Sequence, residues 1–424
     1  KFGGSSVANA ERIRHVASII GIYTAEKPIV VLSAMGDTTD HLLDAAEDAV
    51  RGKVDISQIE KLHYDTAKEL NIDISAVSQL LCELKTLLTG ISMLKELTKR
   101  TRDYLVSFGE RMSVRMMSSY LASQNIPAQY YDSWDMGFVS DSNFMSAELL
   151  DEVWQTIPRA FDAYTKNSDN RIPIVTGFIA KDKNGNITTL GRGGSDLTAT
   201  IIGAALNVKE VQTWKDVDGI MTTDPRVCPQ AHTVPVVTYE EAQELAMFGA
   251  QVLHPRSMVP CRKTGVPVRV KNSYNIQSQG SIIVEKSAEE RTPVIAITSV
   301  KHVTLIDIVS TRMLGACGFL AHIFNQFLKW NISIDVIATS EVSVSLTVNT
   351  KVDLSGLLAD IQRVADCDVS QSSKILSKGF AALDVAGINV EMISQGASKV
   401  NISMIVSDSE ADKVVKTLHK AYFE

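Results

Sequence analysis

Cysteine is scarce in this sequence, and no feature pairs the few that occur. The chain has 5 cysteines and 8 histidines among 424 residues. No CxxC, HxxxH or HExxH spacing is present. This pattern excludes a disulfide framework and a cysteine zinc site, and it indicates a reducing compartment. The cysteines are Cys82, Cys228, Cys261, Cys317 and Cys367.

An excess of positive charge and a long apolar run are lacking as well. Lys and Arg total 42 against 49 Asp and Glu, which gives a net charge of −7. This balance argues against nucleic acid or an anionic membrane as a partner. No apolar run approaches the roughly 20 residues that cross a bilayer. A signal-peptide pattern is absent too. The chain begins inside a motif, KFGGSS, so we expect residues before Lys1, including any transit peptide, to be missing from this numbering.

What is present is a globular composition that suits two or three domains, with 45% hydrophobic and 21% charged residues. Over residues 1–285, short β-rich runs alternate with helical patterns. This alternation predicts an α/β fold whose mostly parallel sheet is covered by helices on both faces. Ligands in such folds bind at the carboxyl ends of the strands. Residues 56–120 are predicted to be a helical excursion, and the polar segment closed by Pro293 is predicted to be a boundary.

The C-terminal part contains an internal repeat. The run from Phe324, FNQFLKWNISIDVIATSEVSVSLTV, matches the run from Phe380 at a constant offset of 56 (380 − 324). Each copy reads helix, strand, turn, strand. The first copy has an extra strand, Val303 to Arg312, whereas the residues 56 positions later, ADIQRVADCD, read as a helix. Either the copies are interleaved or residues near Ser373 are missing from the numbering, and we expect both.

Two glycine-containing motifs favour anion binding. In KFGGSS, Gly3 and Gly4 let the backbone approach a phosphate, a following helix offers free N–H groups, and Lys1 adds a charge; the alternative is a capped strand-to-helix turn. Neither GxxxxGK[ST] nor GxGxxG occurs in the chain. In TTLGRGGSDLTAT, Arg192 is able to bind a carboxylate through two hydrogen bonds. Asp196 there is either functional or a helix cap.

Two further motifs place carboxylates beside these loops. In SFGERMS, Glu110 follows a glycine and is predicted to open a helix, where it suits either the helix dipole or the ammonium of an amino-acid ligand. In WKDVDGIMTTDPR, a strand ends in polar residues that suit a metal or a ribose, although turn chemistry also explains them. Together the four motifs predict phosphoryl transfer between two anionic partners. The polar residues of the last motif are Lys215, Asp216, Asp218, Asp224 and Arg226.

Taken together, the motifs resemble the aspartate kinase family in order and along nearly the whole chain. KFGGSSVA, VVLSAMGDTTD, RTRDYLVSFGER, PIVTGFIA, TTLGRGGSDLTA, WKDVDGIMTTDPR and FGAQVLHP carry the resemblance of the first part. TRMLGACGFLAHIF with IDVIATSEVSVS resembles the first ACT domain of that family, and VEMISQGASKVNIS resembles the second. The details are most similar to the monofunctional, lysine-sensitive enzymes of plants and their bacterial relatives.

The resemblance implies a fold, domain bounds and a reaction. The fold is an amino-acid-kinase, carbamate-kinase-like three-layer αβα sandwich over residues 1–285. Two α+β, ferredoxin-like ACT domains follow at 293–373 and 374–424, the second incomplete, with the strand near 293–300 as a candidate shared strand. The reaction is transfer of the ATP γ-phosphoryl group to the side-chain carboxylate of L-aspartate, the first step toward Lys, Thr, Met and Ile.

The resemblance also implies roles for the residues of the motifs. The implied catalytic residues are Lys1, Asp196 and Arg192. Lys1 neutralises the transferring phosphate, which Gly3, Gly4 and Ser5 cradle, and Asp196 orients Lys1. Aspartate is held by Thr39, Glu110, Phe178, Arg192 and Ser195. The nucleotide is lined by Lys215, Asp216, Asp218, Asp224 and Arg226. No residue is assigned to metal, because Mg²⁺ is expected to be held through the ATP phosphates. A carboxylate is already nucleophilic, so no general base is needed, and the barrier is repulsion between anions.

For the ACT pair, the resemblance implies a lysine site, with S-adenosylmethionine as a candidate second effector. The residues are Met313, Gly318, Phe319, Leu320, Asp335, Ser340 and Glu341; the alternative is that they are ordinary strand ends and helix caps. A homodimer or a larger assembly is implied, located in the plastid stroma for a plant or algal source and in the cytoplasm otherwise. Gln251 departs from the lysine of some bacterial relatives, which puts a nucleotide contact there in doubt.

Two rival functions are weighed against this one. A glutamate or N-acetylglutamate kinase would share the fold, but Glu110 favours a free amino group and the ACT pair favours aspartate. A catalytically silent ligand sensor would share the ACT domains, but the set of Lys1, Arg192 and Asp196 is intact.

Overall fold

The structure is a computed structural model of the 424-residue chain. It describes residues 1–166, 168–247, 253–286, 294–309, 318–339, 343–349, 353–363, 365–376, 383, 386–395 and 402–423. The chain divides into two compact units. The first unit comprises Lys1–Ile220, Pro235–Tyr239 and Val252–Ser287. The second unit comprises Met221–Val234, Glu240–Gln251 and Ala288–Glu424.

A mostly parallel sheet lies at the centre of the first unit, as the alternation of apolar runs predicts. One part of it has the strand order β1-β4-β2 and the other β7-β9-β10-β8. Phe2 joins the two parts, because it bridges Leu32 of β1 and Trp214 of β7 in parallel. Only the β9–β10 pair is antiparallel. The strands are β1 (Val30–Leu32), β2 (Ala128–Tyr131), β4 (Ile172–Thr176), β7 (Val211–Lys215), β8 (Val236–Thr238), β9 (Val268–Asn272) and β10 (Ser281–Val284).

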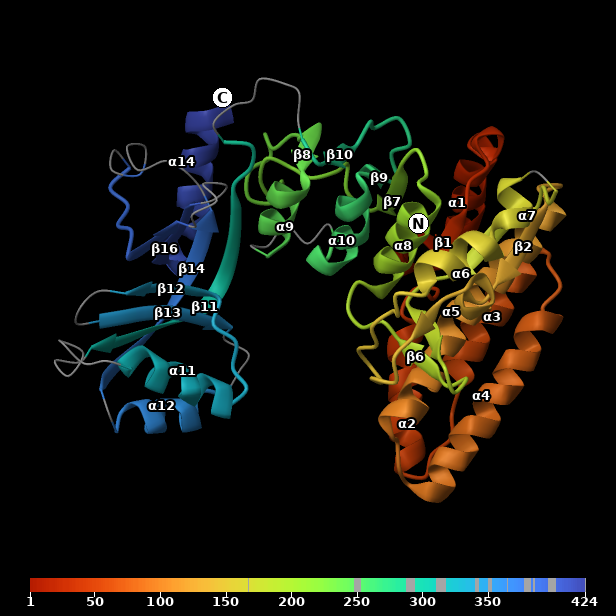
Figure 1. Cartoon of the computed structure of the whole chain (residues 1–424), viewed down its shortest axis with the longest axis horizontal. Helices are drawn as coiled ribbons and strands as arrows, with labels where there is room; N and C mark the ends of the chain where they lie inside the picture. The colour runs from red at the N-terminus through yellow and green to blue at the C-terminus, as the bar shows by residue number, and fades with distance from the viewer. Residues whose placement is uncertain are drawn as a thin grey trace. The chain divides into compact units, whose positions relative to one another are not determined.

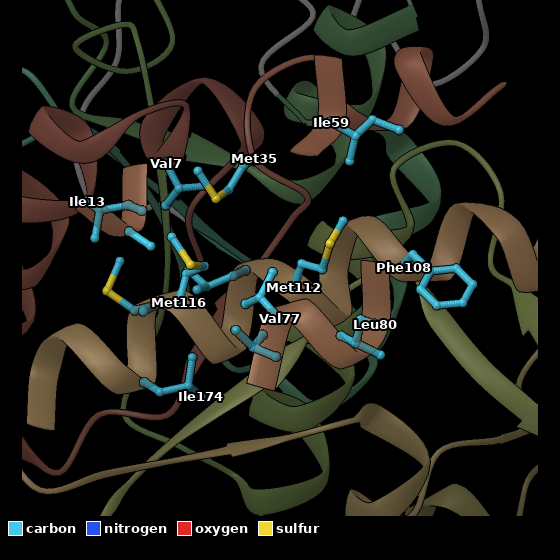
Figure 2. Close-up of a cluster of buried hydrophobic side chains, with 14 of the residues drawn as sticks. Val7, Ile13, Met35, Ile59, Val77, Leu80, Phe108, Met112, Met116 and Ile174 are labelled. Atoms are coloured by element: carbon cyan, nitrogen blue, oxygen red, sulfur yellow. The ribbon is translucent and has the colours of Figure 1, made fainter. Parts of the chain in front are cut away.

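Helices cover this sheet and complete three layers. Val30, Leu32 and Ile174 join a large apolar core with α1 to α5, part of which Figure 2 shows around Met112 and Met116 of α5. Strand side chains alternate between the two faces, and α8 packs against β1 and β7 with α10 beside it (Figure 1). The helices are α1 (Ala10–Ile22), α2 (Thr38–Val50), α3 (Ser57–Leu70), α4 (Ser75–Leu94), α5 (Lys99–Ser123), α8 (Gly194–Leu206) and α10 (Pro255–Thr264). Helix α9 (Tyr239–Met247) belongs to the second unit from Glu240 onward.

Helix α4 contains the one stretch, among the described residues, that is long and apolar enough to cross a membrane. It runs over Val77–Leu94 and meets this test by length and composition only. Leu80, Leu84, Leu88 and Ile91 lie at helical spacing and are buried in the core of the first unit. We interpret the stretch as a core helix, because its apolar face packs against α2 and α5.

A small second sheet carries one of the glycine-rich loops. Its strand order is β3-β5-β6, with β3 (Val139–Ser140), β5 (Ile179–Asp182) and β6 (Ile187–Thr189). The run RIPIVTGFIA therefore holds two strands, β4 and β5, with a turn at Gly177 and Phe178 between them. Two short helices, α6 (Val153–Ala160) and α7 (Asp162–Thr165), lie between β3 and β4 in the chain. Strand β6 ends at Thr189 and α8 begins at Gly194, so Gly191 and Arg192 lie in the loop between them.

The second unit is built on one antiparallel sheet with the order β12-β13-β11-β14-β16-β15. Ile306 and Ile308 of β11 pack with α11 and α12, and Met404 and Val406 of β16 pack with α14. Its strands are β11 (Thr298–Val309), β12 (Val336–Thr339), β13 (Ser343–Asn349), β14 (Asp366–Leu376), β15 (Met392–Gln395) and β16 (Ile402–Ser407). Its helices are α11 (Phe319–Lys329), α12 (Ser355–Ile361) and α14 (Ala411–Phe423).

The sheet corrects one detail of the repeat analysis. The run ADIQRVADCD was expected to be a helix, but α12 ends at Ile361 and β14 begins at Asp366. Strand β14 pairs with β11 over Thr298–Val309, while β11 pairs with β13 over Val303–Val309. The two copies therefore share one sheet through β11, and the division at 373 falls inside β14.

Candidate active site

The first segment of the site is the turn after Phe2. Gly3 precedes a short 3₁₀ helix, Gly4–Val7, and α1 begins only at Ala10. The prediction that the turn leads straight into an α-helix is therefore wrong, and its role as a phosphate-binding turn stays a prediction. Position 4 requires glycine because the backbone there lies close to the loop after β1, and a Cβ would lie 2.9 Å from the Ala34 carbonyl oxygen. The Gly36 N–H also donates to the Gly4 carbonyl (3.1 Å). The turn is thus held against the loop that follows β1.

Three buried or half-buried charges form the centre of the site. Lys1 Nζ lies 2.9 Å from Asp196 Oδ1, and Lys215 Nζ lies 2.9 Å from Asp196 Oδ2. The Lys1 and Asp196 side chains are only 5% and 8% exposed. Burial alone would raise the pKa of Asp196, but the two ammonium groups outweigh it and lower the pKa to about 2. Asp196 is therefore a carboxylate at neutral pH, fixed between two lysines.

The glycine-rich loop Gly191–Gly194 brings Arg192 and Asp196 to this centre. Gly191 and Gly193 have φ of 71° and 74°, which side chains rarely adopt. Gly193 is the N-cap of α8, and Asp196 lies in the first turn of that helix. Phe178 also has a positive φ, 69°, a strain of about 1–3 kcal/mol that is common at functional sites. The Phe178 N–H donates to Thr198 Oγ1 (3.1 Å), which holds the strained turn on α8.

Glu110 lies in the site, but not in the way the sequence suggested. It was expected to open a helix, whereas it sits in the interior of α5, Lys99–Ser123. Its carboxyl Oε1 accepts from the Ala34 N–H (3.3 Å), and Oε2 is buried without a hydrogen-bond partner. Burial raises the pKa of Glu110 to about 8. The carboxyl therefore holds a proton that a cation entering the site would displace.

These segments enclose one open cavity of about 450 Å³ within the first unit. It lies at the carboxyl ends of parallel strands, since Ser33 follows β1 and Phe178 follows β4. All five residues predicted to hold aspartate line it, and so do all three predicted catalytic residues, one of which, Arg192, is in both sets. The seven are Lys1, Thr39, Glu110, Phe178, Arg192, Ser195 and Asp196.

The predicted nucleotide residues are divided between the units. Lys215 ends β7 and contacts Asp196, and Asp218 accepts hydrogen bonds from two asparagine side chains of the first unit. Asp216 is exposed on the same loop. Asp224 and Arg226 belong to the second unit, where they pair with each other (Nη2–Oδ2 2.7 Å). Their role toward the nucleotide stays a prediction.

Sequence reasoning missed two residues that support the glycine-rich loop. His254 caps α10, because its side chain accepts a hydrogen bond from the Arg256 N–H (3.2 Å). His254 also packs against Gly193, where an added Cβ would lie 2.6 Å from the Cβ of His254. The Arg256 guanidinium donates to the carbonyls of Leu190 (3.0 Å) and Ala147 (3.1 Å). The motif FGAQVLHP was the available signal, but it was used only for the resemblance. Gln251 lies outside the described residues.

The predicted lysine site is described only in part. Gly318 is the N-cap of α11 with a φ of 87°, Phe319 packs on the core of the second unit, and Leu320 is 37% exposed. The Asp335 N–H donates to the Thr347 carbonyl (2.9 Å) just before β12. Met313, Ser340 and Glu341 lie outside the described residues. The lysine site therefore remains a prediction.

Comparisons with known proteins agree with this geometry. The sequence matches the amino acid kinase family over residues 1–272 and an ACT domain over residues 368–422. It is 47% identical to the chloroplastic aspartokinase 1 of Arabidopsis thaliana, covering 100% of this chain and 80% of that one.

Two solved structures of the same kind also resemble the chain. E. coli aspartokinase III with lysine and aspartate (T-state) has a TM-score of 0.83 at 30% identity, covering 100% of this chain and 98% of that one. The same enzyme with aspartate and ADP (R-state) has a TM-score of 0.81 at 30% identity, covering 100% and 99%. The shared fold and the relatives along the whole chain show that this chain belongs to the aspartokinases, within the amino acid kinase family.

Proposed function

We propose that the chain transfers the γ-phosphoryl group of ATP to the side-chain carboxylate of L-aspartate, giving 4-phospho-L-aspartate and ADP. The observation that carries the proposal is the single cavity in which the predicted aspartate-holding residues meet the Lys1–Asp196 pair. The two structures of the E. coli enzyme contain aspartate, one of them with ADP. Those ligands support the same substrate and nucleotide here.

Aspartate is recognised through a carboxylate and through its ammonium group. Arg192 is exposed on the cavity wall, and its guanidinium is suited to a carboxylate. Glu110 is buried and is suited to a cation, because the ammonium of aspartate would replace the proton on its carboxyl group. An N-acetylated amino acid would offer Glu110 no cation. This contrast favours a free amino acid as the substrate.

The phosphoryl step needs charge and position, and no proton has to be removed. A side-chain carboxylate oxygen of aspartate attacks the γ-phosphorus, while the bond to the bridging oxygen breaks and its electron pair leaves on ADP. Lys1 faces the transferring oxygens, and Asp196 fixes its ammonium at 2.9 Å. Backbone N–H groups of the turn at Gly3, Gly4 and Ser5 face the phosphates. Fixed charges of this kind stabilise the spreading negative charge of phosphoryl transfer.

The nucleotide is expected to bring Mg²⁺ with it. Within the described part of the chain, no group of three or more His, Cys, Asp or Glu side chains is placed to hold a metal. Asp196 has one lysine on each oxygen, at 2.9 Å in both cases. Because both oxygens of Asp196 are already paired with lysines, we propose that the ion is held mainly through the ATP phosphates. When bound, Mg²⁺ supplies positive charge that offsets repulsion between the anionic reactants.

Regulation by an amino acid belongs to the same proposal. The ACT match and the lysine in a structure of the E. coli enzyme support L-lysine as the inhibitor of this chain. A coupling free energy of about 1–3 kcal/mol between the sites would give useful feedback. S-adenosylmethionine as a second effector, a homodimer or larger assembly, and a plastid location are further parts of the proposal. The chloroplastic relative supports only the last of these.

The test is ADP release from ATP and Mg²⁺ with L-aspartate, L-glutamate or N-acetyl-L-glutamate, each with and without L-lysine. We expect turnover with L-aspartate alone, suppressed by lysine. Turnover that ignores lysine would keep the kinase and remove the effector site. Turnover only with a glutamate substrate, or none from folded protein, would overturn the proposed reaction.

A further inference from the structure

Residues 272–275, which begin with the last residue of β9, contact parts of the candidate active site that are far away in the chain. Ser273, fully buried, lies at the junction. Its N–H donates to the Lys215 carbonyl (2.8 Å). Its Oγ accepts from Arg12 Nη2 (2.9 Å) and lies 3.3 Å from Ser6 Oγ. One small side chain thus contacts the phosphate-binding turn and α1, while its backbone holds the strand end that carries Lys215.

Further contacts make this junction rigid. His15 Nε2 of α1 forms a hydrogen bond with the Ser273 carbonyl. The Arg12 guanidinium lies over the Tyr274 ring, 3.6 Å from its centroid. The Ser6 and Ser273 hydroxyls are both buried, so water cannot easily replace their contact. The position of the phosphate-binding turn relative to Lys215 therefore depends on residues that do not line the aspartate cavity.

The same segment also fixes the loop after β7. Asn272 Nδ2 and Asn275 Nδ2 both donate to Asp218 Oδ1, at 3.0 and 3.1 Å. The Tyr274 N–H donates to Asn272 Oδ1 (2.8 Å), which orients that amide. Asp218 is thereby held as part of a folded loop. Residues 272–275 thus tie together the phosphate turn, Lys215 and the predicted nucleotide loop.

We propose that Ser273 is a positioning residue for the nucleotide, and that it acts by locking the phosphate-binding turn to the end of β7. The two anion-binding segments come from the start and the middle of the first unit. Backbone pairing joins Lys1 and Phe2 to β7, with the Trp214 N–H donating to the Lys1 carbonyl (2.9 Å), and Ser273 adds a link from Ser6 to the end of the same strand. Binding and catalytic groups must be held within about 0.5 Å of the geometry that the reaction needs. A buried link that fixes these segments therefore affects how well the nucleotide binds. The proposal rests on the proposed function, because it assumes that this region binds ATP.

The test compares Ser273→Ala with Ser118→Ala. Ser118 is also buried, and its hydroxyl also joins two elements, donating from α5 to the Ala128 carbonyl (3.4 Å). Both variants lose one hydroxyl, and Ser118 has no part in the site. For Ser273→Ala we expect KM for ATP and Kd for ADP to rise about tenfold, with KM for aspartate within twofold. For Ser118→Ala we expect all three constants to stay within twofold.

A double-mutant cycle with Ser6→Ala separates positioning from loss of stability. If the hydroxyl pair transmits the effect, the double variant raises KM for ATP no more than Ser273→Ala alone. If Ser273→Ala lowers the urea midpoint but leaves KM for ATP and Kd for ADP unchanged, its role is structural and the proposal is wrong. Wild-type turnover is measured first. Its absence would count against the proposed function, whereas turnover with an unaffected Ser273→Ala variant would count against this inference alone.

Discussion

The two units bury different kinds of polar group. In the first unit, Asp103, Glu110, Asp132, Asp182, Asp196 and Lys271 are buried. In the described part of the second unit, the buried polar residues are hydroxyl side chains and one histidine, namely Thr222, Thr223, Thr298, Thr304, Thr347, Ser403 and His419. Buried charges are costly unless paired. In the candidate active site, Asp196 offsets that cost by pairing with Lys1 and Lys215, whereas the buried polar groups in the described part of the second unit are mostly hydroxyls.

The largest expected effect comes from breaking the buried charge cluster. Asp196→Asn leaves the Lys1 and Lys215 ammonium groups without the carboxylate between them. We expect kcat to fall on the order of a thousandfold, and the free energy of unfolding to fall by about 3–5 kcal/mol. Initial rates of ADP release, corrected for the folded fraction from circular dichroism, measure the first, and urea unfolding measures the second. A kcat within tenfold of wild type would show that buried charge does not carry the chemistry.

Glu110 predicts a pH dependence of stability that comes from the candidate active site. Its folded pKa of about 8 lies above the ordinary value of 4.5, so the folded state retains the proton over this window. Stability from this group is therefore present at low pH and lost as pH rises from 4.5 to about 8, by up to about 1.4 kcal/mol per unit. Glu110→Gln should flatten this slope.

Urea unfolding at several pH values between 5 and 8 measures the slope. Glu96→Gln serves as the control, because Glu96 is an exposed glutamate and its replacement should keep the wild-type slope. Parallel slopes for wild type and Glu110→Gln would contradict the raised pKa.

His419 tests the other side of the comparison. It is fully buried, with Nε2 3.2 Å from Thr222 Oγ1 and its ring centroid 4.9 Å from that of Phe423. His419→Ala should cost about 2 kcal/mol or more through the cavity and the lost contact. We expect kcat per folded molecule to stay unchanged, because His419 does not line the candidate active site. A tenfold lower kcat without loss of stability would show that neutral contacts in the second unit also control the chemistry.

The smallest effect is expected at an exposed pair of similar length. Lys301 Nζ lies 2.7 Å from Asp412 Oδ1 in the second unit, with side chains 39% and 51% exposed. Lys301→Ala should change the free energy of unfolding by about 0–1 kcal/mol, and less in high salt. Lys215→Met removes one of the two lysines that pair with Asp196, and it should lower activity far more than Lys301→Ala does. Equal costs for the two lysines would remove the distinction between buried and exposed charge.

The sequence predicted the parts of the site that local chemistry marks. Glycine pairs mark close backbone approach, and an apolar run that ends at Lys215 marks a strand end. Glu110 shows the limit of this reasoning. Its neighbour Gly109 suggested a helix start, yet Gly109 lies inside α5. The position requires glycine because a Cβ there would lie 2.7 Å from Ala34 Cβ. A glycine demanded by helix packing cannot be told from one at a helix end by sequence alone.

The residues that support the site, Ser273 and Arg256, were not predicted from the sequence for a different reason. Ser273 contacts Ser6 and Arg12, which are 267 and 261 positions away. Arg256 reaches Ala147 across 109 positions. Nothing in the neighbouring sequence reports such partners, since they exist only once the sheet has formed. The predicted lysine-binding residues were likewise drawn from the resemblance, because strand ends and helix caps carry no signal of their own.

The shared strand β11 limits how this protein can be re-engineered. It pairs along Thr298–Val309 with β14 and along Val303–Val309 with β13. A graft that took only one repeat onto another enzyme would leave a long open strand edge, which favours aggregation. A transplantable cassette would therefore have to carry both repeats with β11 intact, and only such a cassette would keep the sheet closed on both sides of that strand.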